Sequence, residues 1–315
     1  SVFIFILTYF ILRLDLAFSI VLAALASATA PASTMMTIRQ TGAKGDFVDT
    51  LLQVVALDDV VGLVLYSIAI SIALASLSGV SGFSFETLGN PVLLNLLVLL
   101  LGSIFGLFMK LLMPQKRSKD NKLIISVALL FAFCGVCALL DLSPLLGCMV
   151  MGTVYTNIAD DDKLFKQLNY FSPPLLLLFF VRSGMSFQLD ALISPAGALD
   201  GVPLLVIGAS YFLVRILGKY AGAWLGCRLV GKDRLVRNYL GLALIPQAGV
   251  AIGLAALGAR TLGGAMGSDL QTVILASSVL YELIGPGCAK LALYLSRSYS
   301  TKLEDVAVVE ETTQT

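Results

Sequence analysis

Long apolar stretches, separated by short polar or glycine-containing segments, run along almost the whole chain. Many of them approach or exceed the roughly 20 residues that an α-helix needs to cross a bilayer. Their apolar residues are continuous or recur with a helical period, which favours membrane helices over a β-barrel. The pattern predicts an all-α, polytopic membrane protein with about ten transmembrane helices, near residues 1–13, 16–38, 48–77, 91–113, 121–140, 143–158, 164–189, 202–229, 238–258 and 268–295.

The composition agrees with a chain that lies in lipid. Hydrophobic residues make up 58% of the 315 positions and charged residues 13%, and the mean hydropathy is +0.92. A soluble domain has about 25% charged residues. We therefore expect membrane lipid as the surroundings, and neither a nucleic-acid partner nor a cofactor. Histidine is absent, so any pH response must come from carboxylates or lysines.

Basic residues are distributed unequally between the segments that connect the predicted helices. One side of the membrane receives those at 39–44, 116–122, 163–166, 232–237 and 297–302, and the other side receives only Arg13 and Arg260. By the positive-inside rule the basic side is cytoplasmic, so both ends of the chain are expected there.

The sequences at the two ends of the chain lead to two further predictions. The first apolar run has no initiator Met, no basic start and no cleavage site, so it does not resemble a signal peptide. We expect further helices to precede it. The segment 298–315 is short, polar and acidic at its end, which predicts a disordered cytoplasmic tail.

Two of the predicted spans contain helix breakers at mid-membrane depth. Pro31 interrupts 16–38 and Pro246 interrupts 238–258, each among small residues. Paired interrupted helices in two halves of a transporter indicate a binding site, because unwound backbone presents carbonyls and half-helix ends to ions. An ordinary proline kink is the alternative. The predicted topology runs the two spans in opposite directions, which indicates an inverted repeat.

Two adjacent aspartates, Asp58 and Asp59, lie inside the apolar run 48–77. One charge at the centre of a span costs roughly 2.5–3.5 kcal/mol on insertion scales, so the pair indicates a place where an ion or a proton is handled. A structural pair neutralised by basic partners is the alternative. Consecutive helix positions point about 100° apart. One aspartate should therefore face the unwound crossing and the other a basic side chain. We assign Asp59 to the ion, and Asp58 to Arg215 or Lys219.

The remaining candidate residues are a third intramembrane charge and a set of oxygen ligands. Glu282 is a candidate partner for Arg215, either in a structural ion pair or in transport. The Asp59 carboxylate, the Thr29 hydroxyl and backbone carbonyls at the breaks suit Na+ or K+. No cluster of soft ligands favours a transition metal. The predicted metal site is therefore a monovalent-cation site at Asp59.

Five motifs follow one another along the chain, and together they resemble a known family. The motifs are Ala28-Thr29-Ala30-Pro31-Ala32-Ser33, Leu57-Asp58-Asp59-Val60-Val61-Gly62, Val214-Arg215-Ile216-Leu217-Gly218-Lys219, Pro246-Gln247-Ala248-Gly249-Val250 and Tyr281-Glu282-Leu283-Ile284-Gly285-Pro286. As an ordered set they resemble the bacterial monovalent cation:proton antiporter superfamily, in its Kef-type and electrogenic sodium/proton antiporter branch.

The resemblance implies how the chain is divided and where it works. Residues 1–80 and 200–297 would be the two inverted repeats of an ion-transport core. Residues 120–195 would be part of a dimerisation bundle, with 90–115 as a linker helix. A homodimer in the bacterial inner membrane is implied as well. Relatives have additional N-terminal helices that are absent from this sequence.

The resemblance also implies roles for individual residues. Asp59 would be the principal cation and proton site, and Asp58 its neighbour, associated in the family with electrogenic exchange. The crossing of the unwound segments would bring Thr29, Ala30 and Pro31 near the second break. That break consists of Pro246 and Gln247. Many relatives have a basic residue in place of Gln247, so charge compensation at the crossing must differ here.

The predicted function is exchange of a monovalent cation, Na+ or K+, for protons by alternating access, with Asp58 and Asp59 binding cation and proton competitively. The alternative is a cation channel or permease without obligatory proton exchange, although no filter-like repeat of glycines appears. An enzyme is less favoured, because an aspartyl protease needs two carboxylates on separate helices. The broken spans are lined by Ala, Ser, Thr and Gly, so no organic substrate is expected.

Overall fold

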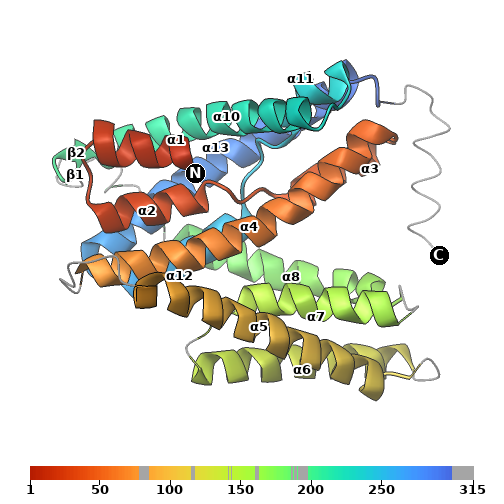
Figure 1. Ribbon diagram of the computed structural model, residues 1–315. Coiled ribbons are helices and arrows are strands. Elements are labelled where there is room, and N and C mark those ends of the chain that lie inside the picture. Colours follow the sequence, from red (N-terminus) through yellow and green to blue (C-terminus); the bar gives the residue numbers. More distant parts are fainter. Residues whose placement is uncertain are drawn as a thin grey trace. The chain divides into compact units, whose positions relative to one another are not determined.

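The computed structural model describes residues 1–77, 85–114, 118–140, 142, 144–159, 163–185, 187, 190 and 198–299. Helices dominate these residues, which confirms the predicted all-α class (Figure 1). The chain divides into two compact units, Ser1–Ser81 with Ser186–Thr315 and Gly82–Met185. The predicted tail lies outside the described residues from 300 onward.

The described helices correspond to the ten predicted apolar runs. Five are long and apolar enough to cross a membrane: α4 (Asp46–Leu77), Leu93–Leu112 of α5 (Phe85–Leu112), Asp120–Leu139 of α6 (Lys119–Leu139), α10 (Leu204–Leu229) and α13 (Gly264–Leu295). Shorter apolar helices lie at Val2–Ile11, Leu16–Leu25, Pro144–Ile158, Phe171–Met185 and Gly249–Leu262. Together they confirm a polytopic membrane protein.

The first unit contains two sets of helices in the same order. The first set is α1 (Val2–Phe5) with the π-helical stretch η1 (Ile6–Ile11), then α2 (Leu16–Leu25), α3 (Pro31–Thr41) and α4. The second set is α10, α11 (Arg234–Ala243), α12 (Gly249–Leu262) and α13. Figure 1 shows α2 and α12 toward one side of the view and α3 and α11 toward the other. The two broken helices therefore run in opposite directions, as the topology predicts.

A proline borders each break. Pro31 is the first residue of α3, a position that suits proline because the first turn of a helix needs no N–H donor. Pro246 follows α11, where its ring and missing N–H prevent the helix from continuing. The breaks meet directly, since the Ala30 N–H donates to the Pro246 carbonyl at 3.0 Å. The crossing of two broken helices is thus confirmed.

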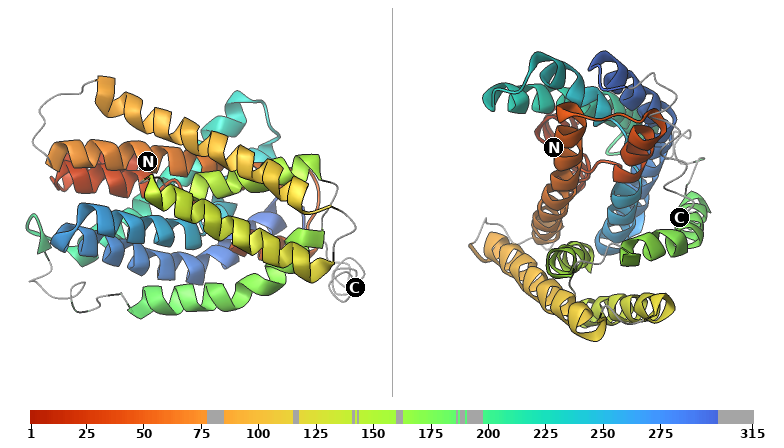
Figure 2. Two further views of the ribbon diagram at one scale, coloured as in Figure 1. Left: turned by 90° about the horizontal axis from the view of Figure 1, so that it is seen from below. Right: turned by 90° about the vertical axis from the view of Figure 1, so that its right-hand side faces the viewer.

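The helices around the crossing pack closely. Within the first unit α2 lies along α4, and α12 lies along α13 (Figure 2). Gly62 of α4 faces the first break, and a Cβ there would lie 3.0 Å from the Ser27 hydroxyl. Gly285 of α13 faces the second break, and a Cβ there would lie 2.8 Å from Pro246 Cγ. These two glycines let long helices approach the unwound segments.

Two further features of the first unit lie near the ends of its helices. At one end a buried apolar cluster joins α3, α4, α10, α11 and α13, and it includes Leu51, Leu240 and Leu293.

At the other end β1 (Ala198–Leu199) and β2 (Val202–Pro203) pair antiparallel. The Asp200 carboxylate between these strands accepts from the Asp15 N–H at 2.8 Å. This contact connects the start of the second repeat to the start of α2.

The second unit consists of α5, α6, α7 (Pro144–Ile158) and α8 (Lys163–Met185). Gly102 of α5 and Gly147 of α7 meet so closely that a side chain at Gly102 would collide with the Gly147 carbonyl. Small residues allow membrane helices to approach in this way. The helix α5, expected as a linker, therefore packs inside this unit. The dimerisation role of the bundle stays a prediction.

Candidate functional site

Arg215 of α10 holds the two unwound segments together. Its side chain is buried, and its guanidinium donates three hydrogen bonds to backbone carbonyls. Nε donates to Ala26 at 3.0 Å, Nη2 to Ala28 at 2.6 Å and Nη1 to Ile245 at 2.8 Å. The first two carbonyls belong to the first break and the third to the second. A planar guanidinium with five donors can bind several acceptors at once, so one side chain fixes both segments.

The partner expected for Arg215 is not the one it has. The Arg215 guanidinium lies over the Tyr281 ring, 4.6 Å from its centroid, and the Tyr281 hydroxyl donates to the Phe212 carbonyl at 2.9 Å. Glu282 is exposed on α13, and no described ion pair joins it to Arg215. The expected Glu282–Arg215 pair is therefore not seen, and the preceding residue, Tyr281, faces Arg215 instead. Successive residues of a helix point about 100° apart, so only one of the two can face inward.

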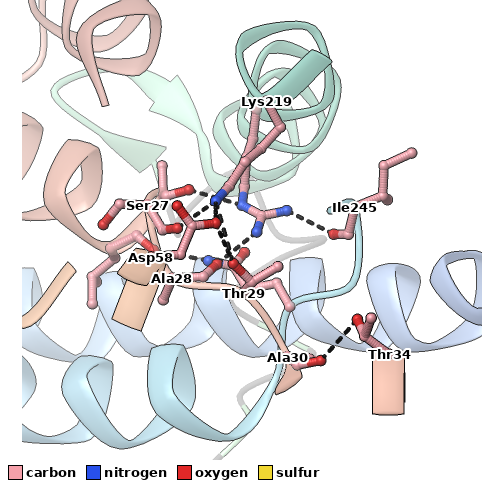
Figure 3. A network of polar contacts seen from close by, with 12 residues as sticks. Ser27, Ala28, Thr29, Ala30, Thr34, Asp58, Lys219 and Ile245 are labelled. Atoms are coloured by element: carbon pink, nitrogen blue, oxygen red, sulfur yellow. Dashed lines mark hydrogen bonds and ion pairs between the residues drawn. The ribbon is translucent and has the colours of Figure 1, made fainter. Parts of the chain in front are cut away.

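Asp58 and Lys219 form an ion pair beside the first break (Figure 3). The Lys219 ammonium lies 2.6 Å from Asp58 Oδ2, and the two side chains are 12% and 25% exposed. Asp58 Oδ2 also accepts from the Thr29 hydroxyl at 2.6 Å. The ammonium donates in addition to the Ser27 carbonyl at 2.6 Å. Between Arg215 and Lys219, the two partners left open by the sequence, the structure pairs Asp58 with Lys219.

Asp59 has a different environment from its neighbour. It is 8% exposed and lies on the buried face of α4 with Val55, Gly62 and Tyr66. Its Oδ1 atom is shielded and has no hydrogen-bond partner among the described residues. Buried carboxylate oxygens rarely lack a partner, and an ion or a proton is one explanation of such a case. The two aspartates therefore differ as their 100° separation predicts: one is ion-paired, and the other has an oxygen without a partner among the described residues.

Gln247 completes the crossing without a charge. Its side chain is fully buried, and its amide nitrogen donates to the Leu25 carbonyl at 2.8 Å. Its amide oxygen accepts from the Tyr211 hydroxyl at 3.1 Å. Gln247 thus hydrogen-bonds the end of α2, while the positive charge at the crossing comes from Arg215 on the neighbouring helix.

The charges at the crossing fit the half-helices that meet there. The carboxyl ends of α2 and α11 have a partial negative charge, and Arg215 and Lys219 donate to carbonyls at these ends. Asp58 and Asp59 supply two carboxylates against these two cations. A proton and a monovalent cation would each add one positive charge to this balanced set.

A cavity of about 180 Å³ lies beside the ion pair. Its lining includes Ser27, Asp58, Arg215, Gly218 and Lys219. A water molecule occupies about 30 Å³ of liquid volume, so the cavity has room for a monovalent cation with several waters.

Most of the predicted site residues come together, and two aromatic residues complete the site. The residues at the crossing are Thr29, Ala30, Pro31, Asp58, Asp59, Arg215, Lys219, Pro246 and Gln247. No ion pair among the described residues joins Glu282 to Arg215. Sequence reasoning missed Tyr211 and Tyr281. One signal was available for Tyr211, because it precedes Arg215 by four positions and so shares its helix face. The roles of all these residues in transport stay predictions.

Comparison with known proteins adds an independent finding. The sequence profile of a family described as "Sodium/hydrogen exchanger, transmembrane" matches residues 1–292. The high-affinity Na(+)/H(+) antiporter NhaS3 of Synechocystis sp. is 23% identical over 188 residues. This alignment covers 60% of the present chain and 39% of that protein, so the match spans less than half of the relative's length.

Proposed function

This chain belongs to the sodium/hydrogen exchanger family, and we propose that it exchanges a monovalent cation, Na+ or K+, for protons across a membrane. The observation that carries the proposal is the aspartate pair at the crossing of the two breaks. Asp58 lies 2.6 Å from Lys219, and Asp59 has a shielded oxygen without a partner among the described residues. A buried carboxylate of this kind can take up either a cation or a proton.

Competition at Asp59 is the proposed basis of exchange. The carboxylate binds one proton or one hard cation, and each excludes the other because both neutralise the same charge. The Thr29 hydroxyl, the carbonyls of the unwound segments and water would supply the remaining oxygen ligands. Release of one ion is thereby linked to uptake of the other.

The Asp58–Lys219 pair is proposed to respond to the state of Asp59. A cation bound at Asp59 adds positive charge beside Lys219 and weakens its attraction to Asp58. If Lys219 then releases its proton, more positive charge leaves than enters and the exchange is electrogenic. If Lys219 keeps its proton, the exchange is electroneutral. The response of transport to membrane voltage separates these two cases.

Alternating access and the location are further parts of the proposal. The unit of Ser1–Ser81 and Ser186–Thr315 would be the transport core and Gly82–Met185 the scaffold of a homodimer. The family resemblance implies the inner membrane of a bacterium, and the basic connections predict that both ends of this chain lie in the cytoplasm. The compactness of each unit supports movement of one as a rigid body.

The experiment is transport by the protein reconstituted in liposomes with an acidic interior. Na+, K+ or Li+ is added outside, and the internal pH is followed with a fluorescent dye. Addition of the transported cation should drive protons out of liposomes that contain the native protein, so the internal pH should rise. Asp59→Asn removes the charge that both ions need, so its rate should fall to that of empty liposomes.

The matched control is Asp49→Asn. Asp49 is an exposed residue of the same helix, α4, and the chemical change is identical, so this variant should exchange ions at close to the native rate. Cation uptake without proton movement would favour the channel or permease alternative. An Asp59→Asn variant that still exchanges would overturn the proposed site.

A further inference from the structure

Trp224, near the end of α10, has two arginine side chains close to its ring. It is the one tryptophan of the sequence. The Arg228 guanidinium lies 5.1 Å from its ring centroid, and the Arg237 guanidinium of α11 lies 5.7 Å from it. Both distances are within the range of a cation–π interaction. The turn from α10 to α11 therefore places two positive charges against one indole.

Neither arginine is neutralised by a carboxylate within the described part of the chain. Lys232 in the same turn differs, because its ammonium lies 2.7 Å from Asp46 Oδ1. Arg228 is exposed, and Arg237 Nε is shielded without a hydrogen-bond partner. Two unpaired like charges on one ring repel each other. A bound anion would relieve the repulsion and satisfy the free donors.

An apolar stripe leads along α10 to this position. Leu213 and Leu217 are 60% and 65% exposed, and they share one face of the helix with Trp224 and Arg228 at spacings of four, seven and four residues. The helix is long and apolar enough to cross a membrane. Indole rings favour the level of the lipid headgroups, which places the two guanidiniums at the depth of a lipid phosphate.

We propose that Trp224, Arg228 and Arg237 form a binding site for the phosphate headgroup of an anionic lipid, with an acyl chain along Leu213 and Leu217. The planar guanidiniums suit bidentate contacts with phosphate oxygens. Basic groups at the cytoplasmic end of membrane helices attract anionic headgroups, and the basic connections predict that this end is cytoplasmic. The apolar stripe favours a lipid over a free phosphate ion, because a phosphate ion has no acyl chain to lie on Leu213 and Leu217. The proposal does not depend on ion exchange.

The test is lipid binding by the detergent-solubilised protein. Phosphatidylglycerol, phosphatidylcholine or inorganic phosphate is added, and both the thermal unfolding midpoint and the lipid retained in native mass spectrometry are measured. We expect phosphatidylglycerol alone to raise the midpoint. Removing both charges in Arg228→Gln/Arg237→Gln should weaken apparent binding about tenfold or more.

The matched control is Arg234→Gln. Arg234 is exposed in the same part of the chain and has no cation–π contact with Trp224, so its loss should change binding less than threefold. In phosphatidylcholine, Arg228→Gln/Arg237→Gln must have the same unfolding midpoint as the native protein. Arg228→Lys/Arg237→Lys keeps both charges, so it should bind phosphatidylglycerol more tightly than Arg228→Gln/Arg237→Gln. Equal weakening by Arg234→Gln would mean diffuse attraction and overturn the site. An equal effect of phosphatidylcholine or of inorganic phosphate would overturn the assignment to an anionic lipid.

Discussion

Two basic residues one helical turn apart on α10 have different partners. Arg215 binds carbonyls of both breaks and the face of Tyr281, and no hydrogen bond or ion pair among the described residues joins it to either aspartate. Lys219 binds Asp58 directly. A guanidinium with fixed donors suits a structural clamp, whereas a flexible ammonium that can lose its proton suits a group that changes partners. We propose that Arg215 holds the two breaks together and that Lys219 changes its partner during exchange.

The Asp58–Lys219 pair can be tested by a double-mutant cycle. Lys219→Gln leaves the Asp58 charge in a largely buried position without its ion-pair partner, and Asp58→Asn does the same for Lys219. Each single change should lower the free energy of unfolding by about 2–4 kcal/mol, because breaking a buried pair leaves an uncompensated charge. The double variant should lose less than the sum of the two.

The measurement is chemical unfolding of the purified protein followed by tryptophan fluorescence. A coupling energy above about 1 kcal/mol would establish the pair. The cation-driven proton flux of each variant is recorded in the same preparation. Additive effects on stability would show that the pair contributes nothing, and the proposed link between Lys219 and Asp59 would fall with it.

At the scale of the helices, the crossing depends on glycines as much as on prolines. Pro31 begins α3 after the first break and Pro246 follows α11 at the second, and Gly62 and Gly285 let α4 and α13 lie against these breaks. The unwound carbonyls are then close enough for Arg215 and Lys219 to reach them. Breaks without these close contacts would leave buried carbonyls unsatisfied, which is costly in lipid.

Gly285→Ala tests this packing. The added Cβ would lie 2.8 Å from Pro246 Cγ and 3.0 Å from Pro246 Cα, so the second break must shift. Overpacking of this kind costs about 1–3 kcal/mol. We expect a lower unfolding midpoint in differential scanning fluorimetry and at least tenfold slower exchange.

Gly287→Ala is the control for this substitution. Gly287 is on the same helix, and a Cβ there meets nothing within 4 Å. Its stability and its transport should match those of the native protein. If both alanine variants behaved alike, packing against Pro246 would not explain the effect.

At the scale of the whole molecule, the distribution of basic residues predicts the orientation in the membrane. Lys232, Arg234 and Arg237 precede or begin α11, whereas Arg260 lies near the end of α12. α11 and α12 together form one broken span, so these residues belong to opposite sides. The positive-inside rule assigns the first group to the cytoplasm.

Arg234→Cys and Arg260→Cys test the orientation with the same substitution at two exposed positions. A membrane-impermeant maleimide should label Arg234→Cys in inside-out vesicles and Arg260→Cys in right-side-out vesicles. The five native cysteines are buried or half-buried, and the native protein gives the background. Labelling of both variants from one side would refute the topology.

The sequence by itself determined the features that depend only on residues close together along the chain. Apolar period and length predicted the membrane helices, and each predicted run corresponds to a described helix. Pro31 and Pro246 predicted the two breaks, because a missing N–H and a restricted φ act wherever the residue lies. The adjacent aspartates indicated an ion site, because a charge in lipid is expensive in any fold.

The tertiary structure decided which of the distant residues meet. Lys219 lies 161 positions from Asp58 and 192 from Ser27, so its choice of partners depends on how α10 rotates and packs against α4. The packing of α10 also places Arg215 over the Tyr281 ring and lets the Tyr211 hydroxyl donate to Gln247. Glu282, one position after Tyr281, is exposed. A one-residue change of position turns a helical side chain by about 100°. Composition and periodicity cannot resolve that angle, and only packed neighbours set it.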